Sequence, residues 1–362
     1  MSNNTILERN GPTYGISFTR TQADILIEHV LNKKIVSFEC IDTGYNNLIF
    51  FIDVDGSTQR YALKIGGRYW NKIKTVAEIK ALELIHQYTN IPVPEIVDHS
   101  SDRNNQFGVE WILMTRLSGE NMGMICERQE LSINAKKSIA RDLADYVYQM
   151  HFKIPRFNQI GAFTLNGQIG TDLNRLGPWS SYEQFIRNRV QAERIVLNTD
   201  SVFAPIKDAM NEAIDQFEQI QWSTFTNLPF VFSHGDLDCQ NILISMDDCE
   251  SPHITGIVDW EWAGSFPCSE EYFTSFDYFR NDSDELRNFF FDELEKRNIL
   301  TPRTIEHFPL IEKLNQFVTN LALWHLTDLV NPNDPNIKKK LDESLSNVQS
   351  ALVELKKSCD FK

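Results

Sequence analysis

Two short polar segments, each enclosed by apolar residues, constrain this chain more than any other feature of its sequence. Residues 232–244 read FSHGDLDCQNILI, and residues 257–264 read IVDWEWAG. The apolar residues on both sides predict strands, so we expect the polar residues in loops that rigid elements support. Asp236, Asn241 and Asp259 have the most informative spacing: H-x-D-x-x-x-x-N, followed by an acid 18 residues later.

These residue types fit one kind of chemistry. Phosphoryl transfer needs a carboxylate that orients the accepting hydroxyl, and a metal ion that bridges the phosphates. Asp236 could orient and deprotonate a hydroxyl, while Asn241 and Asp259 offer the hard oxygen ligands that magnesium binds. Asp and Asn are also common in ordinary turns. Their joint spacing and apolar surroundings favour a functional site.

Composition and charge limit the function classes. The chain has 362 residues, 42% hydrophobic and 23% charged, which suits a globular protein of two domains or lobes. Its formal net charge of −15 argues against a nucleic-acid partner and against adhesion to an anionic membrane. Six scattered cysteines without a Cys-x-x-Cys pair predict free thiols in a reducing compartment. Because neither a leader sequence nor a membrane-spanning run is evident, we expect a cytoplasmic protein.

The hydrophobic pattern changes along the chain from period two to the helical period. Period-two runs predict three strands between residues 35 and 65, and Asp55-Gly56 predicts a hairpin between the second and the third. Another strand is expected within 107–117. Helical periodicity predicts a series of helices, with a β-rich patch among the later ones. The helices are expected at 19–32, 75–88, 131–152, 181–197, 204–221 and 303–326, and the patch at 230–262.

This order predicts an α+β fold of two lobes. The N-terminal lobe, residues 1–117, should be a small antiparallel sheet with one main helix. The C-terminal lobe, residues 118–362, should be larger and mostly helical, with a hinge at about 114–119.

The two polar segments also carry a resemblance to a known family. HGDLDCQNIL followed by IVDWEWAG resembles the catalytic loop and metal-binding motif of the aminoglycoside phosphotransferase and choline kinase superfamily. The resemblance implies a two-lobed, protein-kinase-like fold. It also implies an enzyme that uses ATP and Mg²⁺. It also implies Asp236 as catalytic base, Asn241 and Asp259 as metal ligands, and His234 as a structural support of the loop.

The N-terminal lobe can be compared with the same family. Lys64 shares one face of its predicted strand with Ala62 and resembles the family's phosphate-binding lysine, with Glu78 of the next helix as its ion-pair partner. The family covers the phosphates with the turn between the first two strands, which here is residues 42–47. This turn differs from a G-x-G-x-x-G loop because Gly44 is its single glycine. Main-chain N–H groups of this turn could still cover phosphates. The resemblance places nucleotide contacts in this turn and at the hinge: Gly44, Tyr45 and Asn46, and Met114, Thr115 and Arg116 at the adenine edge.

The acceptor site is expected in the C-terminal lobe, near the acid-rich stretch 269–297. Carboxylates there could hold the ammonium groups of an acceptor, although a solvated helix face would show the same acidic pattern. Glu261, two residues after Asp259, is expected to point to the same side as Asp259 if the segment is an extended strand. The candidate acceptor residues are Asp238, Glu261, Trp262, Glu270 and Glu271.

The sequence therefore predicts an ATP- and Mg²⁺-dependent phosphotransferase acting on a hydroxyl of a small molecule, including cationic ones such as aminoglycosides or amino alcohols. No nucleic-acid, membrane or obligate protein partner is expected. A protein kinase is an alternative, but Gly235 stands where such enzymes typically have Arg, and no A-P-E-like segment follows. A non-catalytic nucleotide-binding protein is another, but it would usually lack one of Lys64, Asp236, Asn241 or Asp259. The motifs leave the acceptor open, because specificity resides in the pocket.

Overall fold

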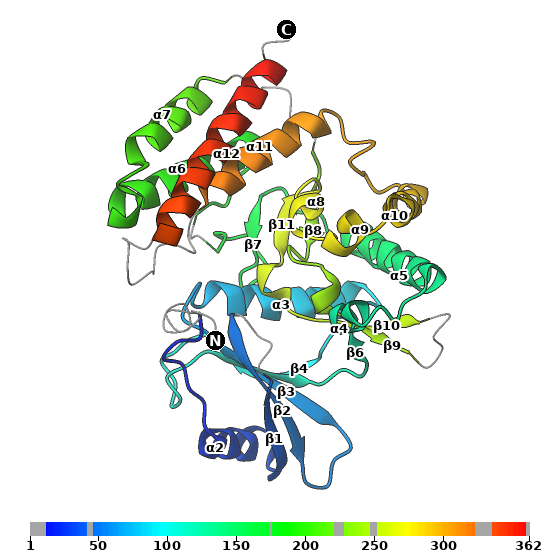
Figure 1. The fold of residues 1–362 in the computed structure, drawn as a ribbon. Coiled ribbons are helices and arrows are strands. Elements are labelled where there is room, and N and C mark those ends of the chain that lie inside the picture. The colour runs from blue at the N-terminus through cyan, green and yellow to red at the C-terminus, as the bar shows by residue number, and fades with distance from the viewer. Residues whose placement is uncertain are drawn as a thin grey trace.

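The computed structural model describes residues 12–41, 46–173, 176–220, 228–246, 252–322 and 335–359. The chain forms two lobes, as predicted (Figure 1). The predicted boundary near residue 117 lies between the last strand of the first sheet and the first helices of the larger lobe.

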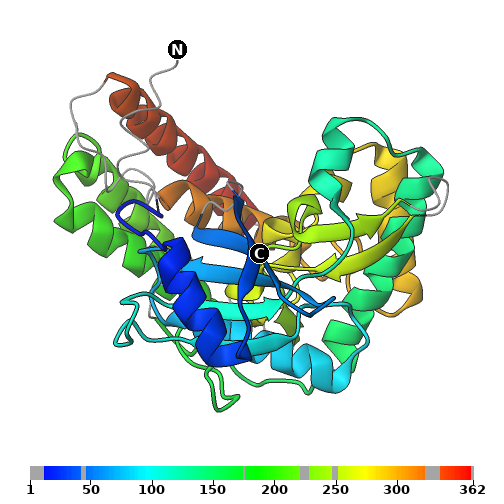
Figure 2. The same cartoon turned by 90° about the horizontal axis from the view of Figure 1, so that it is seen from below.

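A five-stranded antiparallel sheet forms the N-terminal lobe, in the order β1-β2-β3-β5-β4. Helix α2 lies along one face of this sheet, as Figure 2 shows, and α3 lies between the sheet and the C-terminal lobe (Figure 1). The elements are α2 (Arg20–Leu31), β1 (Ile35–Ile41), β2 (Asn47–Val54), β3 (Arg60–Gly66), α3 (Ile73–Tyr88), β4 (Ile96–Ser100) and β5 (Trp111–Thr115).

Alternation along β3 gives each face of the sheet its own helix. Leu63 and Ile65 belong to the apolar cluster that contains Leu26 of α2. On the other face, Ala62 packs with Ile79 of α3. Because side chains alternate along a strand, Lys64 shares the face of Ala62 and points toward α3, as the sequence predicted.

The C-terminal lobe is mostly helical, with two three-stranded sheets, β10-β9-β6 and β7-β11-β8. Its strands are β6 (Glu120–Asn121), β7 (Gly161–Ala162), β8 (Phe230–Ser233), β9 (Ile242–Ser245), β10 (His253–Ile257) and β11 (Gly264–Pro267). Its α-helices are α4 (Met122–Glu127), α5 (Ile133–Phe152), α6 (Tyr182–Thr199), α7 (Lys207–Glu218), α8 (Glu271–Thr274), α9 (Asp277–Asn281), α10 (Asp284–Lys296), α11 (Phe308–Leu321) and α12 (Pro335–Cys359). Three 3₁₀ turns complete the described part: η1 (Ser201–Phe203), η2 (Cys239–Asn241) and η3 (Trp260–Trp262).

The predicted elements are present in the structure, but helices α4 and α10 were not among them. The hairpin at Asp55-Gly56 forms, with Gly56 at a φ of 60°. The helix expected from residue 303 begins only at Phe308, because the preceding residue, His307, has a left-handed conformation (φ 59°). Helix α12, which packs against α11 and α7, was not predicted. Within the described ranges, no helix combines the length and apolar character needed to cross a bilayer.

Candidate active site

The buried side chain of His234 anchors the loop between β8 and β9 by two hydrogen bonds. This side chain is fully buried, its Nε2 donates to the carbonyl of Val258 at 3.1 Å, and its Nδ1 accepts from the main-chain N–H of Asp236 at 3.2 Å. One nitrogen donates and the other accepts, so the ring is neutral. Burial lowers the pKa of His234 to about 4, which keeps it neutral at pH 7. His234 therefore joins the loop to the segment that carries Asp259, in accord with a structural role.

Gly235 allows this loop to lie against the second motif. It has a φ of 80°, and a Cβ atom there would lie 2.6 Å from the carbonyl oxygen of Trp262. Only glycine meets both conditions without strain.

Asp236, the predicted base, is oriented by Asn241. The Asn241 side-chain amide donates to the main-chain carbonyl of Asp236 at 2.7 Å and to its carboxylate at 3.2 Å. Burial, together with the nearby charge of Asp259, raises the pKa of Asp236 to about 7, against the lowering effect of the Asn241 hydrogen bond. A carboxyl poised near neutral pH is well suited to accept a proton.

Lys64 lies among three carboxylates at the junction of the lobes. Its Nζ is 2.7 Å from Glu78, 2.6 Å from Asp259 and 3.2 Å from Glu261. Burial alone would lower the pKa of Lys64, but the carboxylates outweigh it and hold that pKa well above its ordinary value. The structure thus brings Lys64 together with Glu78, and adds two contacts that the sequence did not indicate.

Glu261 points to the same side as Asp259, but not for the predicted reason. The segment is not an extended strand: Asp259 has a left-handed backbone (φ 64°), and Trp260 to Trp262 form the 3₁₀ turn η3. Trp260 is fully buried, and its indole N–H donates to the carbonyl of Ile257 at 3.0 Å. This anchor turns the chain so that both acids reach Lys64.

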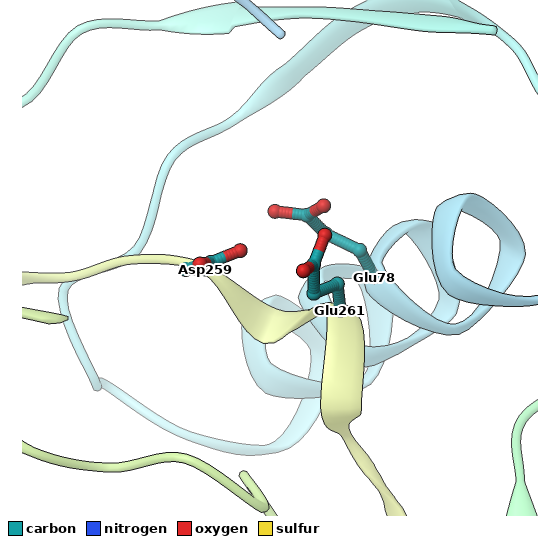
Figure 3. A group of neighbouring side chains, drawn as sticks. All are labelled: Glu78, Asp259 and Glu261. Atoms are coloured by element: carbon teal, nitrogen blue, oxygen red, sulfur yellow. The ribbon is translucent and has the colours of Figure 1, made fainter. Parts of the chain in front are cut away.

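One carboxylate oxygen each of Glu78, Asp259 and Glu261 lies within 4.8 Å of the other two, and Figure 3 shows the three side chains converging from α3, from η3 and from the residue just before η3. The ammonium of Lys64 lies among them, so in this arrangement it is the cation that they share. Asn241 and Asp259 fit a magnesium ion better. The amide nitrogen of Asn241 is engaged with Asp236, so its side-chain oxygen is the atom that would bind a metal ion, and Asp259 is only half-buried. The main-chain bond from Val258 to the Asn241 carbonyl, 3.0 Å, holds the two segments side by side.

The predicted nucleotide-contact residues are only partly described. Gly44 and Tyr45 lie outside the described residues. The side chain of Asn46 donates to Glu261 at 3.1 Å. At the predicted hinge, the N–H groups of Thr115 and Arg116 already donate to the carbonyls of Glu95 and Arg60, both at 2.9 Å.

These two hinge N–H groups are therefore engaged within the N-terminal lobe. Met114 is buried in β5. A contact to the adenine edge through main-chain N–H groups at Thr115 or Arg116 does not fit this arrangement.

Two of the five candidate acceptor residues form hydrogen bonds that connect the loop between β8 and β9 to the segment that follows β11. The carboxylate of Asp238 accepts from the N–H of Tyr278 at 3.0 Å. Glu271 is buried and accepts from the N–H of His234 at 3.1 Å, so it supports the loop from behind. Direct contact of Glu271 with an acceptor does not fit this position, and neither does a solvated helix face.

Glu270 and Trp262 occupy different surroundings. Glu270 is buried, with Arg189 of α6 at 3.3 Å. Trp262 is half-buried and meets the ring of Trp70 edge to face, with 4.9 Å between the ring centroids. Trp262 therefore lies at the contact between the lobes, beside Gly235.

Sequence reasoning missed Lys74, and it considered Asn47 only for its main-chain N–H and not for its side chain. Both side chains are buried beside Glu261. No local pattern marks them, because a lysine near the start of a helix is ordinarily solvated.

Comparison with known proteins gives the family. The sequence model of the phosphotransferase enzyme family matches residues 37–304, about three quarters of the chain. This chain belongs to that family. Membership confirms the predicted superfamily and the predicted class, a small-molecule phosphotransferase. A search of curated proteins found no match.

Solved structures of this family share the fold. APH(2")-IIia in complex with GDP and kanamycin is 14% identical, with a TM-score of 0.53 over 92% of this chain and 99% of that one. Macrolide 2'-phosphotransferase MphH from Brachybacterium faecium is 12% identical, with a TM-score of 0.53 over 89% and 98%. Spectinomycin phosphotransferase APH(9)-Ia in complex with ADP and spectinomycin is 13% identical, with a TM-score of 0.52 over 92% and 98%. At these identities the likeness confirms the predicted protein-kinase-like fold.

Proposed function

We propose that this phosphotransferase moves the γ-phosphoryl group of ATP to a hydroxyl of a small molecule, with Mg²⁺ as cofactor. The observation that carries the proposal is the position of Asp236. It is oriented by Asn241, has a pKa raised to about 7, and lies in a loop that His234 ties to the segment bearing Asp259. This is the arrangement that a general base for an attacking hydroxyl requires.

The main residues of the site would each have one role in this reaction. Lys64, held by Glu78, would bind the phosphates of the nucleotide, which lies between the lobes. Asn241 and Asp259 would hold magnesium, which when bound neutralises charge on the phosphates. Asp236 accepts the proton of the acceptor hydroxyl as its oxygen attacks the γ-phosphorus, and ADP leaves.

The solved relatives support a nucleotide as donor and a hydroxylated small molecule as acceptor. Two of them were solved with GDP or ADP together with kanamycin or spectinomycin. For this chain, the donor and the acceptor class are part of the proposal. Both can be read from one assay.

The test is ADP release with Mg²⁺ and ATP, then GTP, across a panel of aminoglycosides, macrolides, amino alcohols, amino acids and sugars. We expect one acceptor class to stimulate turnover. Asp236→Ala should lower that turnover roughly 10²–10⁴-fold with nucleotide affinity unchanged, the range for a positioned general base. Near-normal turnover in Asp236→Ala would remove Asp236 from the mechanism. Nucleotide binding with no turnover above Asp236→Ala, with or without any acceptor, would favour a non-catalytic nucleotide-binding protein.

A further inference from the structure

A second buried lysine lies beside the candidate active site. Lys74, the second residue of α3, is only 2% exposed. Its ammonium donates to the side-chain oxygen of Asn47 at 2.9 Å and to the main-chain oxygen of Asn46 at 3.2 Å. Lysine is rarely buried to this extent unless its charge is compensated. The two amide oxygens satisfy hydrogen bonds, but they carry no charge.

The compensating charge is reached through Asn47. Its amide nitrogen donates to one carboxylate oxygen of Glu261 at 2.7 Å, while its amide oxygen accepts from Lys74. Asn47 is 4% exposed and Glu261 is 1% exposed. The amide dipole therefore lies between a buried ammonium and a buried carboxylate with each end toward the opposite charge, an arrangement that low dielectric strengthens. We call Lys74, Asn47 and Glu261 the relay.

The relay also balances the charges around Lys64. One ammonium at Lys64 faces three carboxylates, of Glu78, Asp259 and Glu261. Lys64 and Lys74 lie in the same buried group of side chains as Glu261 and Glu78. Lys74 thus supplies a second positive charge next to Glu261. The charge of Glu261 is then compensated by two ammonium groups and depends less on Lys64 alone.

The relay joins three parts of the chain that would contact a nucleotide or hold its neighbours. Asn46 and Asn47 are the last two residues of the predicted phosphate-covering turn at 42–47, and Asn47 pairs with Gly66 at the end of β3. Asn46 is fixed twice more: its carbonyl accepts from Gly67 at 3.2 Å, and its side chain donates to Glu261. Glu261 belongs to the segment that begins with Asp259, so α3, β2 and η3 meet in one polar contact.

We propose that Lys74 is a positioning residue for the phosphate donor. Acting through Asn47 and Glu261, it fixes the positions of Asn46 and Asn47 and leaves Lys64 able to bind phosphate. This inference rests on the proposed function, because the ligand that it positions is the nucleotide. Lys74 does not contact the reacting atoms, so its loss should weaken nucleotide binding more than it weakens the chemical step.

The main variant is Lys74→Met, which keeps the length of the side chain and removes its charge. Lys72→Met is the matched control, because Lys72 is exposed and lies only two residues away. Binding of a fluorescent ADP analogue with Mg²⁺ and steady-state turnover are measured for both variants and for the wild type. We expect Lys74→Met to weaken analogue binding and raise the KM for ATP at least tenfold. The KM for the acceptor should stay within about twofold, and kcat should fall less than the affinity for the nucleotide.

Asn47→Leu tests the relay without removing a charge, and it carries the test if Lys74→Met fails to fold. It should reproduce the loss of affinity. In the double variant the loss should be no larger than in the single variants, because residues that act as one unit are not additive. Thermal unfolding of each variant identifies those that are folded.

The outcomes separate the two proposals. If the wild type binds the analogue and the relay variants bind it as tightly as Lys72→Met does, Lys74 has no positioning role and the proposed function stands. Losses that multiply in the double variant would also overturn the relay. If the wild type binds no nucleotide with Mg²⁺, both proposals fall.

Discussion

The activity of this enzyme should fall about tenfold for each pH unit below about pH 7, because Asp236 must be ionised to accept a proton. Burial, with the charge of Asp259, raises the pKa of Asp236 from its ordinary 3.8 to about 7. At pH 6 about one molecule in ten would carry the ionised base, against about nine in ten at pH 8. A carboxyl of ordinary pKa would be ionised throughout this range.

The assay is kcat/KM for the nucleotide, measured as ADP release between about pH 5 and 9, because this ratio reports the ionisation of the free enzyme. Asp238→Asn supplies the perturbation. The charge of Asp238 also raises the pKa of Asp236, and an Asn side chain keeps the oxygen that accepts from the N–H of Tyr278. The variant should therefore move the acid limb to lower pH while the loop stays in place. Ionisations of the nucleotide and the acceptor cancel in the difference between variant and wild type.

Two results would refute this reasoning. A wild-type profile that stays flat between about pH 6 and 8 would mean that Asp236 is not the group whose ionisation limits the reaction. An acid limb that stays at the same pH in Asp238→Asn would assign the limb to another group.

Two further substitutions test the supports of the site. Lys64→Met should lower the free energy of unfolding by about 3–5 kcal/mol at pH 8, because three carboxylates lose their shared cation. At pH 6 the loss should be smaller, since protonation relieves the repulsion; equal losses in guanidinium titrations at the two pH values would contradict this account. Glu271→Ala should lower stability by about 1–3 kcal/mol and reduce kcat, because the N–H of His234 loses its acceptor. If Glu271→Ala raised only the KM for the acceptor, Glu271 would instead be a residue that contacts the acceptor.

The sequence predicted those parts of the site that lie within one local pattern. Asp236 and Asn241 are five residues apart in a loop between two apolar strands, and the structure joins them by hydrogen bonds. Lys64 and Ala62 share a face of β3 because alternation along a strand is a property of the backbone itself. The orientation of Glu78 toward Lys64 follows from helix α3 packing on that face. Each of these inferences needs only a short segment and the pairing of its neighbours.

The remaining parts depend on contacts between distant segments. Asn47 and Glu261 are 214 residues apart in sequence, and nothing near Lys74 indicates that its ammonium is buried. The sequence also contained no indication of the left-handed backbone of Asp259, because an acidic residue after an apolar run indicates only the end of a strand. Glu271 lies in an acid-rich stretch whose pattern indicates a solvated helix. Its true partner, the main chain of His234, belongs to another element.

The pair of Lys64 and Asp259 gives the proposed function a thermodynamic consequence. Their side chains are 2.6 Å apart, so Asp259 depends on the ammonium that it shares with Glu78 and Glu261. In the proposed reaction the ammonium binds phosphate and the carboxylate binds magnesium. If the ammonium alone changed partner, the half-buried carboxylate of Asp259 would be left without its cation, which is costly. Exchange of both restores the balance, so nucleotide and metal should each raise the affinity for the other by the same factor.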